Sequence, residues 1–69
     1  MFKKWKQRRL RELKDELRGM VAARVVIGSI VFTLDDDDDR KQEGQDIIED
    51  LLVDEKELRL KIARIEARL

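Results

Sequence analysis

The side chains that most often perform catalysis are largely missing from this sequence. The 69-residue chain contains no histidine and no cysteine, so it lacks the commonest general base and the thiol nucleophile. Its side-chain hydroxyl groups, on Ser29 and Thr33, stand in an apolar segment without a basic neighbour. Carboxylates alone can supply acid and base only when two of them share a water-poor cleft, and the acids here fall in strongly charged stretches. We therefore predict a non-enzymatic protein with no catalytic residues.

Five consecutive aspartates at positions 35–39 raise the question of a metal site. Acidic residues fall on positions 1, 3, 5, 9 and 12 of a calcium-binding EF-hand loop: Asp35, Asp37, Asp39, Glu43 and Asp46. The sixth position requires glycine and is occupied by Arg40, and the twelfth carries the shorter aspartate in place of the bidentate glutamate. We therefore expect a solvated acidic loop, with no metal site and no cofactor.

Basic residues crowd the start of the chain and form the main candidate for binding an outside partner. The cations that could contact a polyanion are Lys3, Lys4, Lys6, Arg8, Arg9 and Arg11. Together with Phe2 and Trp5, such a segment suits phosphate backbones or an anionic membrane surface. The alternative is a solubilising helix whose aromatic side chains pack on another subunit. The acidic half of the chain could neutralise these cations, which favours the second interpretation and makes nucleic acid the less favoured partner.

The size of the chain predicts self-association. A chain of 69 residues forms one domain, and domains this small usually need a disulfide, a metal or another subunit for stability. Without cysteine or histidine, a second copy is the stabilising element left. Charge is also unevenly distributed, since residues 1–34 carry nine bases and three acids, a net +6 that residues 35–69 balance. Opposite charges on two halves can attract each other within or between subunits.

The first half of the chain divides at Gly19 by composition. Residues 2–18 have leucines at helical spacing, and Gly19 stands where a helix often ends. Residues 21–34 are rich in β-branched side chains, which favour strands, and Gly28 followed by Ser29 is typical of a tight hairpin turn. This pattern predicts an amphipathic helix followed by an apolar β-hairpin.

The second half reads as a loop and a helix. Residues 35–45 form the acidic loop, and residues 46–69 have the clearest helical periodicity, with Asp46 as N-cap and Glu49 three residues later. The single domain, 1–69, is thus predicted to be α+β, a helix–β-hairpin–helix unit in a dimer or higher oligomer. Because the hairpin would be shorter than the last helix, we expect apolar residues of both to form the oligomer interface: Val25, Ile27, Ile30, Phe32, Leu58, Ile62, Ile65 and Leu69.

An all-α alternative stays open, in which residues 2–34 form one helix that folds back on the last one. Apolar residues then meet in layers, Leu10 with Leu69, Leu13 with Ile65, Leu17 with Ile62 and Met20 with Leu58. The same register brings together Arg24 and Glu55, the one charged residue on each apolar stripe. Two such hairpins would make a four-helix bundle. Gly19, Gly28 and the β-branched residues argue against an unbroken helix.

The sequence favours a self-associating structural or interaction protein over a nucleic-acid-binding module or a membrane-surface anchor. The apolar stretch of residues 20–34 includes Arg24 and is shorter than the roughly 20 residues of a helical span. No signal peptide is evident, and we expect a soluble cytoplasmic protein with little affinity for membranes. The absence of Pro, Cys, His, Tyr and Asn suits a de novo designed sequence, whereas a long acidic loop does not.

Overall fold

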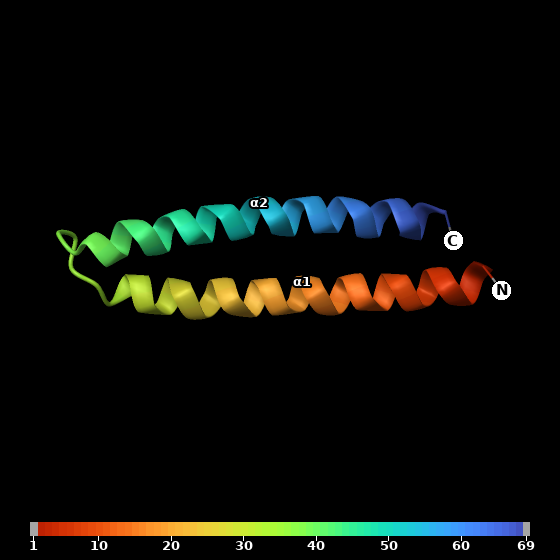
Figure 1. Cartoon of the computed structure of the whole chain (residues 1–69), viewed down its shortest axis with the longest axis horizontal. Coiled ribbons are helices and arrows are strands. Elements are labelled where there is room, and N and C mark those ends of the chain that lie inside the picture. The colour runs from red at the N-terminus through yellow and green to blue at the C-terminus, as the bar shows by residue number, and fades with distance from the viewer. Residues whose placement is uncertain (1, 69) are drawn as a thin grey trace.

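Two long α-helices joined by a short loop make up the computed structural model, which describes residues 2–68 (Figure 1). Helix α1 spans Phe2–Phe32 and helix α2 spans Asp39–Ala67. They run side by side in opposite directions, so the two ends of the chain lie at one end of a rod and the loop lies at the other. The rod measures 55 × 15 × 11 Å. The described chain is therefore an all-α antiparallel helical hairpin.

The predicted β-hairpin at residues 21–34 is wrong, and with it the α+β fold class. Helix α1 continues through Gly19 and Gly28, and no glycine among residues 2–68 has a positive φ angle. The β-branched residues that favour a strand are also apolar, and several of them lie on the face of α1 that packs against α2. Packing of that face stabilises a helix more strongly than the local preference opposes it. Tertiary contact thus overrides propensity in this segment.

The core lies along one stripe of each helix. Leu10 and Leu13 of α1 are buried against Leu58 and Ile62 of α2, with three half-buried neighbours at their edge: Leu17, Met20 and Ile65. These are the residues that the helical alternative placed in facing layers. That alternative is confirmed as a hairpin of two helices, and the further step to a four-helix bundle stays a prediction.

The loop is shorter than the sequence indicated, because α2 begins at Asp39 and includes the second half of the expected loop, 35–45. Asp38 is the N-cap, and its carboxylate accepts a hydrogen bond from the backbone N–H of Arg40 at 3.0 Å. Asp46 lies inside the helix and accepts a hydrogen bond from the side-chain amide of Gln42 at 2.9 Å, so its predicted capping role is wrong. Several aspartates in a row offer several caps, and packing of Gly44, before Asp46, against Val31 favours the early one.

Near the loop the two helices approach closely at Gly44. Gly44 is buried, and a Cβ atom built on it would clash with the Cγ2 methyl of Val31. The absence of a side chain at Gly44 therefore allows α2 to lie directly on Val31. Gly19 and Gly28 have open space around the corresponding position, so neither is required by packing within the hairpin.

Candidate functional site

The aspartate run does not gather into a group that could hold a metal ion within the described chain. Among residues 2–68 there is no cluster of three or more acidic side chains arranged to hold a metal ion. Asp36 pairs with Lys41, and the Arg40 guanidinium lies 2.8 Å from the Asp38 carboxylate. Hydrogen bonds from these cations hold the pKa of Asp36 and of Asp38 below the usual value. Both groups therefore stay ionised and are unsuited to donate a proton near neutral pH.

Three of the acidic EF-hand positions lie within α2, and both side-chain hydroxyl groups hydrogen-bond to backbone carbonyls. Asp39, Glu43 and Asp46 lie on successive turns of α2, so the twelve residues do not form a single loop. The Ser29 hydroxyl donates to the Val25 carbonyl at 3.0 Å, and the Thr33 hydroxyl donates to the Ile30 carbonyl at 2.7 Å. Neither hydroxyl lies beside a base that could activate it.

One charged group lies at the centre of the hairpin. Glu55 is 0% exposed, and its carboxylate accepts a hydrogen bond from Arg24 Nε at 2.7 Å and a longer contact from Arg24 Nη2 at 3.3 Å. Arg59, one turn further along α2, approaches the same carboxylate at 3.4 Å. All buried side-chain polar atoms of the described residues have partners. The ion pair is therefore a structural contact that joins the helices at the predicted register.

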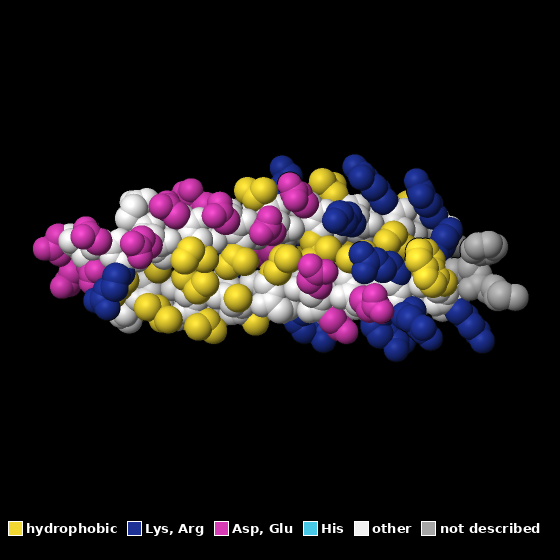
Figure 2. Space-filling model, viewed as in Figure 1, with side chains coloured by type: hydrophobic (Ala, Val, Ile, Leu, Met, Phe, Trp, Pro, Cys, Tyr) yellow, Lys and Arg dark blue, Asp and Glu magenta, His cyan; other side chains and the backbone are white. Residues whose placement is uncertain are grey.

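The most conspicuous surface feature is apolar and lies near the loop. On α1, Val25 is 57% exposed, Ile30 56% and Phe32 89%, and Val26 is similarly open. Further exposed apolar side chains come from α2: Ile47, Leu52, Val53 and Leu60. Figure 2 shows hydrophobic side chains along the seam between the helices and over the half of α1 nearest the loop. We call the exposed apolar residues within 21–32 and 47–53 the apolar collar.

The predicted interface residues divide between this collar and the core. Val25, Ile30 and Phe32 are exposed and Ile27 is half-buried. Leu58 and Ile62 are buried inside the hairpin and Ile65 is half-buried beside them, because α1 is long enough to cover them. Leu69 lies outside the described residues.

Four exposed apolar residues near the loop were not among the predicted interface residues: Val26, Ile47, Leu52 and Val53. Each lies off the stripe that packs within the hairpin, yet each is apolar in an otherwise charged chain. Their apolar character away from the packing stripe is visible in the sequence and could have identified them as candidate interface residues.

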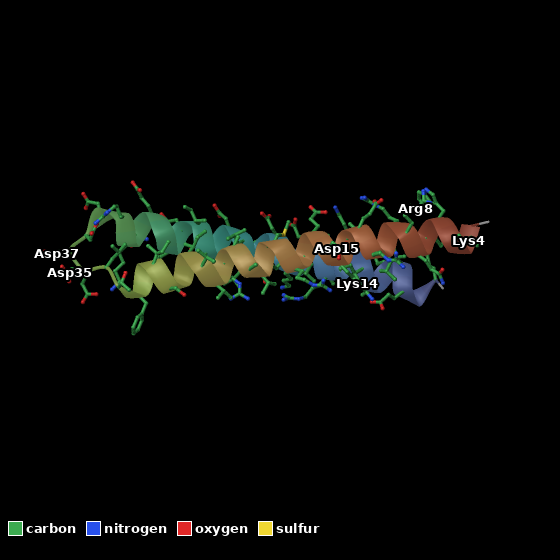
Figure 3. The ribbon with its side chains drawn as sticks, turned by 90° about the horizontal axis from the view of Figure 1, so that it is seen from below. Lys4, Arg8, Lys14, Asp15, Asp35 and Asp37 are labelled. Carbon is green, nitrogen blue, oxygen red and sulfur yellow. The ribbon has the colours of Figure 1, made fainter. Side chains whose placement is uncertain are left out.

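Charge is segregated along the rod, as Figures 2 and 3 show. Residues 25–54, on the loop side, carry ten acids and two bases, a net −8. Residues 2–24 and 55–68, on the side of the chain ends, carry fourteen bases and six acids, a net +8. Asp35 and Asp37 lie at one extremity, and Lys4 and Arg8 at the other. Folding has converted two oppositely charged halves of a sequence into two oppositely charged ends of a molecule.

The predicted polyanion-binding cations lie at the basic end on the first turns of α1. Lys4, Arg8, Arg9 and Arg11 are exposed and Lys6 is half-exposed; the side chain of Lys3 lies outside the described part. Arg9 pairs with Glu12 at 3.6 Å, whereas Lys4, Arg8 and Arg11 contact no acid within the described chain.

Known proteins add nothing to this picture. No protein-family model, no curated protein and no solved structure matches the chain. No helix within residues 2–68 combines the length and apolar character needed to cross a membrane.

Proposed function

We propose that this protein is a non-enzymatic helical hairpin that acts as a self-associating structural unit, with a second copy covering the side of the apolar collar that includes Ile30 and Ile47. The observation that supports this proposal is the exposure of Ile30 on α1 and Ile47 on α2, which are 56% and 48% exposed. A helix that is apolar around its circumference is typical of a buried helix. In a single hairpin only one side of residues 21–32 meets α2.

The small core argues in the same direction. The buried hydrophobic residues of the described chain are few: Leu10, Leu13, Val31, Leu58 and Ile62. A 69-residue chain without disulfides or metals buries too little apolar surface to leave much stability in reserve. Covering exposed collar residues stabilises the protein by about 25 cal/mol for every Å² of apolar surface removed from water. Association would thus stabilise both the fold and the assembly.

Solution mass tests the proposal directly. At low micromolar concentration, sedimentation equilibrium should give twice the 8.2 kDa chain mass or a higher multiple. Ile30→Lys should shift the protein toward monomer, because the new charge would be desolvated in the assembly. Ser29→Lys is the matched control, since the adjacent residue lies about 100° around the helix and is already polar. A monomeric parent protein with native helix content would contradict the proposal.

A second candidate function, polyanion binding, is favoured by the unpaired cations Lys4, Arg8 and Arg11. Replacing all three with glutamine should abolish binding to a fluorescein-labelled random duplex and reduce its salt dependence. Replacement of Lys56, Lys61 and Arg64 with glutamine removes as many charges from α2 and serves as control. Absence of duplex binding by the parent protein at about 0.15 M salt would rule out this function at physiological ionic strength.

A further inference from the structure

One flank of the hairpin carries an apolar pair at each end. At the basic end, Trp5 and Ile65 line a shallow hollow, and Trp5 is 66% exposed. Ile30 follows Trp5 by 25 residues, about seven helical turns, so both lie on the same side of α1. Ile47 precedes Ile65 by 18 residues, about five turns, and shares a side of α2. Ile30 and Ile47 therefore form the matching pair at the acidic end.

Figure 2 shows hydrophobic side chains running along the seam between the helices from one end of the rod toward the other. We propose that a second copy of the chain docks flank to flank in the antiparallel direction. Trp5 and Ile65 of each copy then pack against Ile30 and Ile47 of the other. This inference rests on the proposed self-association and specifies its surface and orientation.

Charge selects the antiparallel orientation. In a parallel dimer the loop-side −8 of one copy lies along the −8 of the other, and the two +8 ends coincide. Turning one copy end to end places each acidic end on a basic end. Like charges brought together at an interface are unfavourable, whereas complementary charge sets orientation and register.

The charged residues bordering the flank are likewise basic at one end and acidic at the other. The hollow around Trp5 is bordered by cations, Lys6, Arg9 and Arg68. Asp54 lies seven residues after Ile47 on the same edge of α2, at the border of the loop-side segment. In the antiparallel arrangement the acidic rim of one copy faces the basic rim of the other.

The opposite flank does not offer an equivalent surface. Phe32 lies two residues from Ile30, about 200° around α1, and so belongs to that other flank. At the basic end the opposite flank has a hollow bordered largely by polar and charged residues, including Gln7, Arg11 and Lys14. Apolar contact there could join only the two loop-side halves, which would bring acid onto acid.

A distance measurement tests the orientation. Asp37 lies at the loop end and makes no hydrogen bond or ion pair with other described residues. Asp37→Cys, the sole cysteine of such a variant, would carry a nitroxide label without altering the fold. Electron–electron double resonance of the labelled assembly should give a separation near the 55 Å length of the rod. A separation near its 15 Å width would overturn the antiparallel orientation and leave self-association intact.

No dipolar coupling, together with a monomeric mass, would contradict the proposed self-association as well. A second readout uses Trp5, the single tryptophan of the chain. Its fluorescence should shift to shorter wavelength on association, and Ile47→Lys at the far end of the rod should abolish that shift. Leu52→Lys, an equally exposed leucine on another side of α2, should leave it in place. Equal loss in both variants would overturn the assignment of the flank.

Discussion

Arg24 and Glu55 illustrate how a single ion pair can specify the alignment of two helices. Glu55 is fully buried, whereas the Arg24 side chain keeps 30% of its surface exposed. Desolvation of such a pair offsets much of its attraction, so the pair adds little stability compared with apolar residues of similar size. Any other register, however, would leave the Glu55 carboxylate buried opposite an apolar side chain. The pair therefore contributes to specificity more than to stability.

This reasoning predicts an asymmetric response to substitution. Arg24→Met should lower the free energy of unfolding by about 3 kcal/mol, the low end for an orphaned buried charge, because Arg59 compensates in part. Glu55→Met should cost less, because the long Arg24 side chain can turn its charge into water. The double variant should be at least as stable as the parent. Urea unfolding of the parent, the two single variants and the double variant measures these free energies. A double variant less stable than either single variant would contradict the prediction.

The N-cap of α2 predicts a dependence of stability on pH. Hydrogen bonds from the Arg40 side chain and backbone hold the pKa of Asp38 below its usual value. The ionised group thus stabilises the folded state above the unfolded pKa of about 4, and this contribution is lost as pH falls through the lowered folded value. Asp38→Asn, which can still cap, should show a smaller loss of melting temperature below pH 4 than the parent. Asp37→Asn should behave like the parent, and equal slopes for all three would contradict this role.

At the scale of the helices, the three glycines have different consequences although all lie in helical backbone. Glycine lowers helix stability relative to alanine by about 1 kcal/mol at an interior position. Gly28 has open space where a Cβ would lie, whereas at Gly44 that atom would meet Val31. One glycine is therefore a local defect of α1, and the other permits close contact between the helices.

Alanine substitutions should separate these two roles. Gly28→Ala should raise the free energy of unfolding by about 0.5–1 kcal/mol, because helix propensity improves without a clash. Gly44→Ala should be destabilising, because Val31 is β-branched and buried and cannot move aside freely. Combining Gly44→Ala with Val31→Ala should relieve the clash and recover part of the loss. A stabilising Gly44→Ala, measured by thermal unfolding, would show that the helices are not in this close contact.

At the scale of the whole molecule, the hairpin is a rod with opposite charges at its two ends. Neither helix alone has this property to the same degree, since α1 carries no base after Arg24 and the bases of α2 outnumber its acids only after Glu57. The antiparallel fold places the basic part of α1 beside the basic part of α2, so the charge differences along the two helices add. The result is a molecule whose long axis has a defined electrostatic polarity, which a second copy can recognise when reversed.

The polarity predicts that salt weakens self-association. Raising ionic strength from about 0.01 M to about 0.1 M shortens the screening length from about 30 Å to about 10 Å and should raise the dissociation constant. Asp35→Asn combined with Asp37→Asn removes two charges from the acidic end without touching the N-cap and should flatten this dependence. Sedimentation at several salt concentrations measures both proteins. Tighter association at higher salt would indicate that like-charged ends are in contact.

The sequence by itself determined the charge asymmetry and the absence of common catalytic groups, whereas the register of the two helices followed only from its helical alternative. The spacing of Leu13, Met20, Leu58 and Ile65 is enough to define facing stripes, and Arg24 opposite Glu55 follows from the same count. Residues 21–34 were misread because β propensity is local, whereas helix α1 is maintained by contact with α2. Only the tertiary structure decided between a hairpin and a helix for residues 21–34, because the energy of burying an apolar face depends on what lies across from it. The same cause separates Leu58 and Ile62, which are covered, from Ile30 and Phe32, which are not.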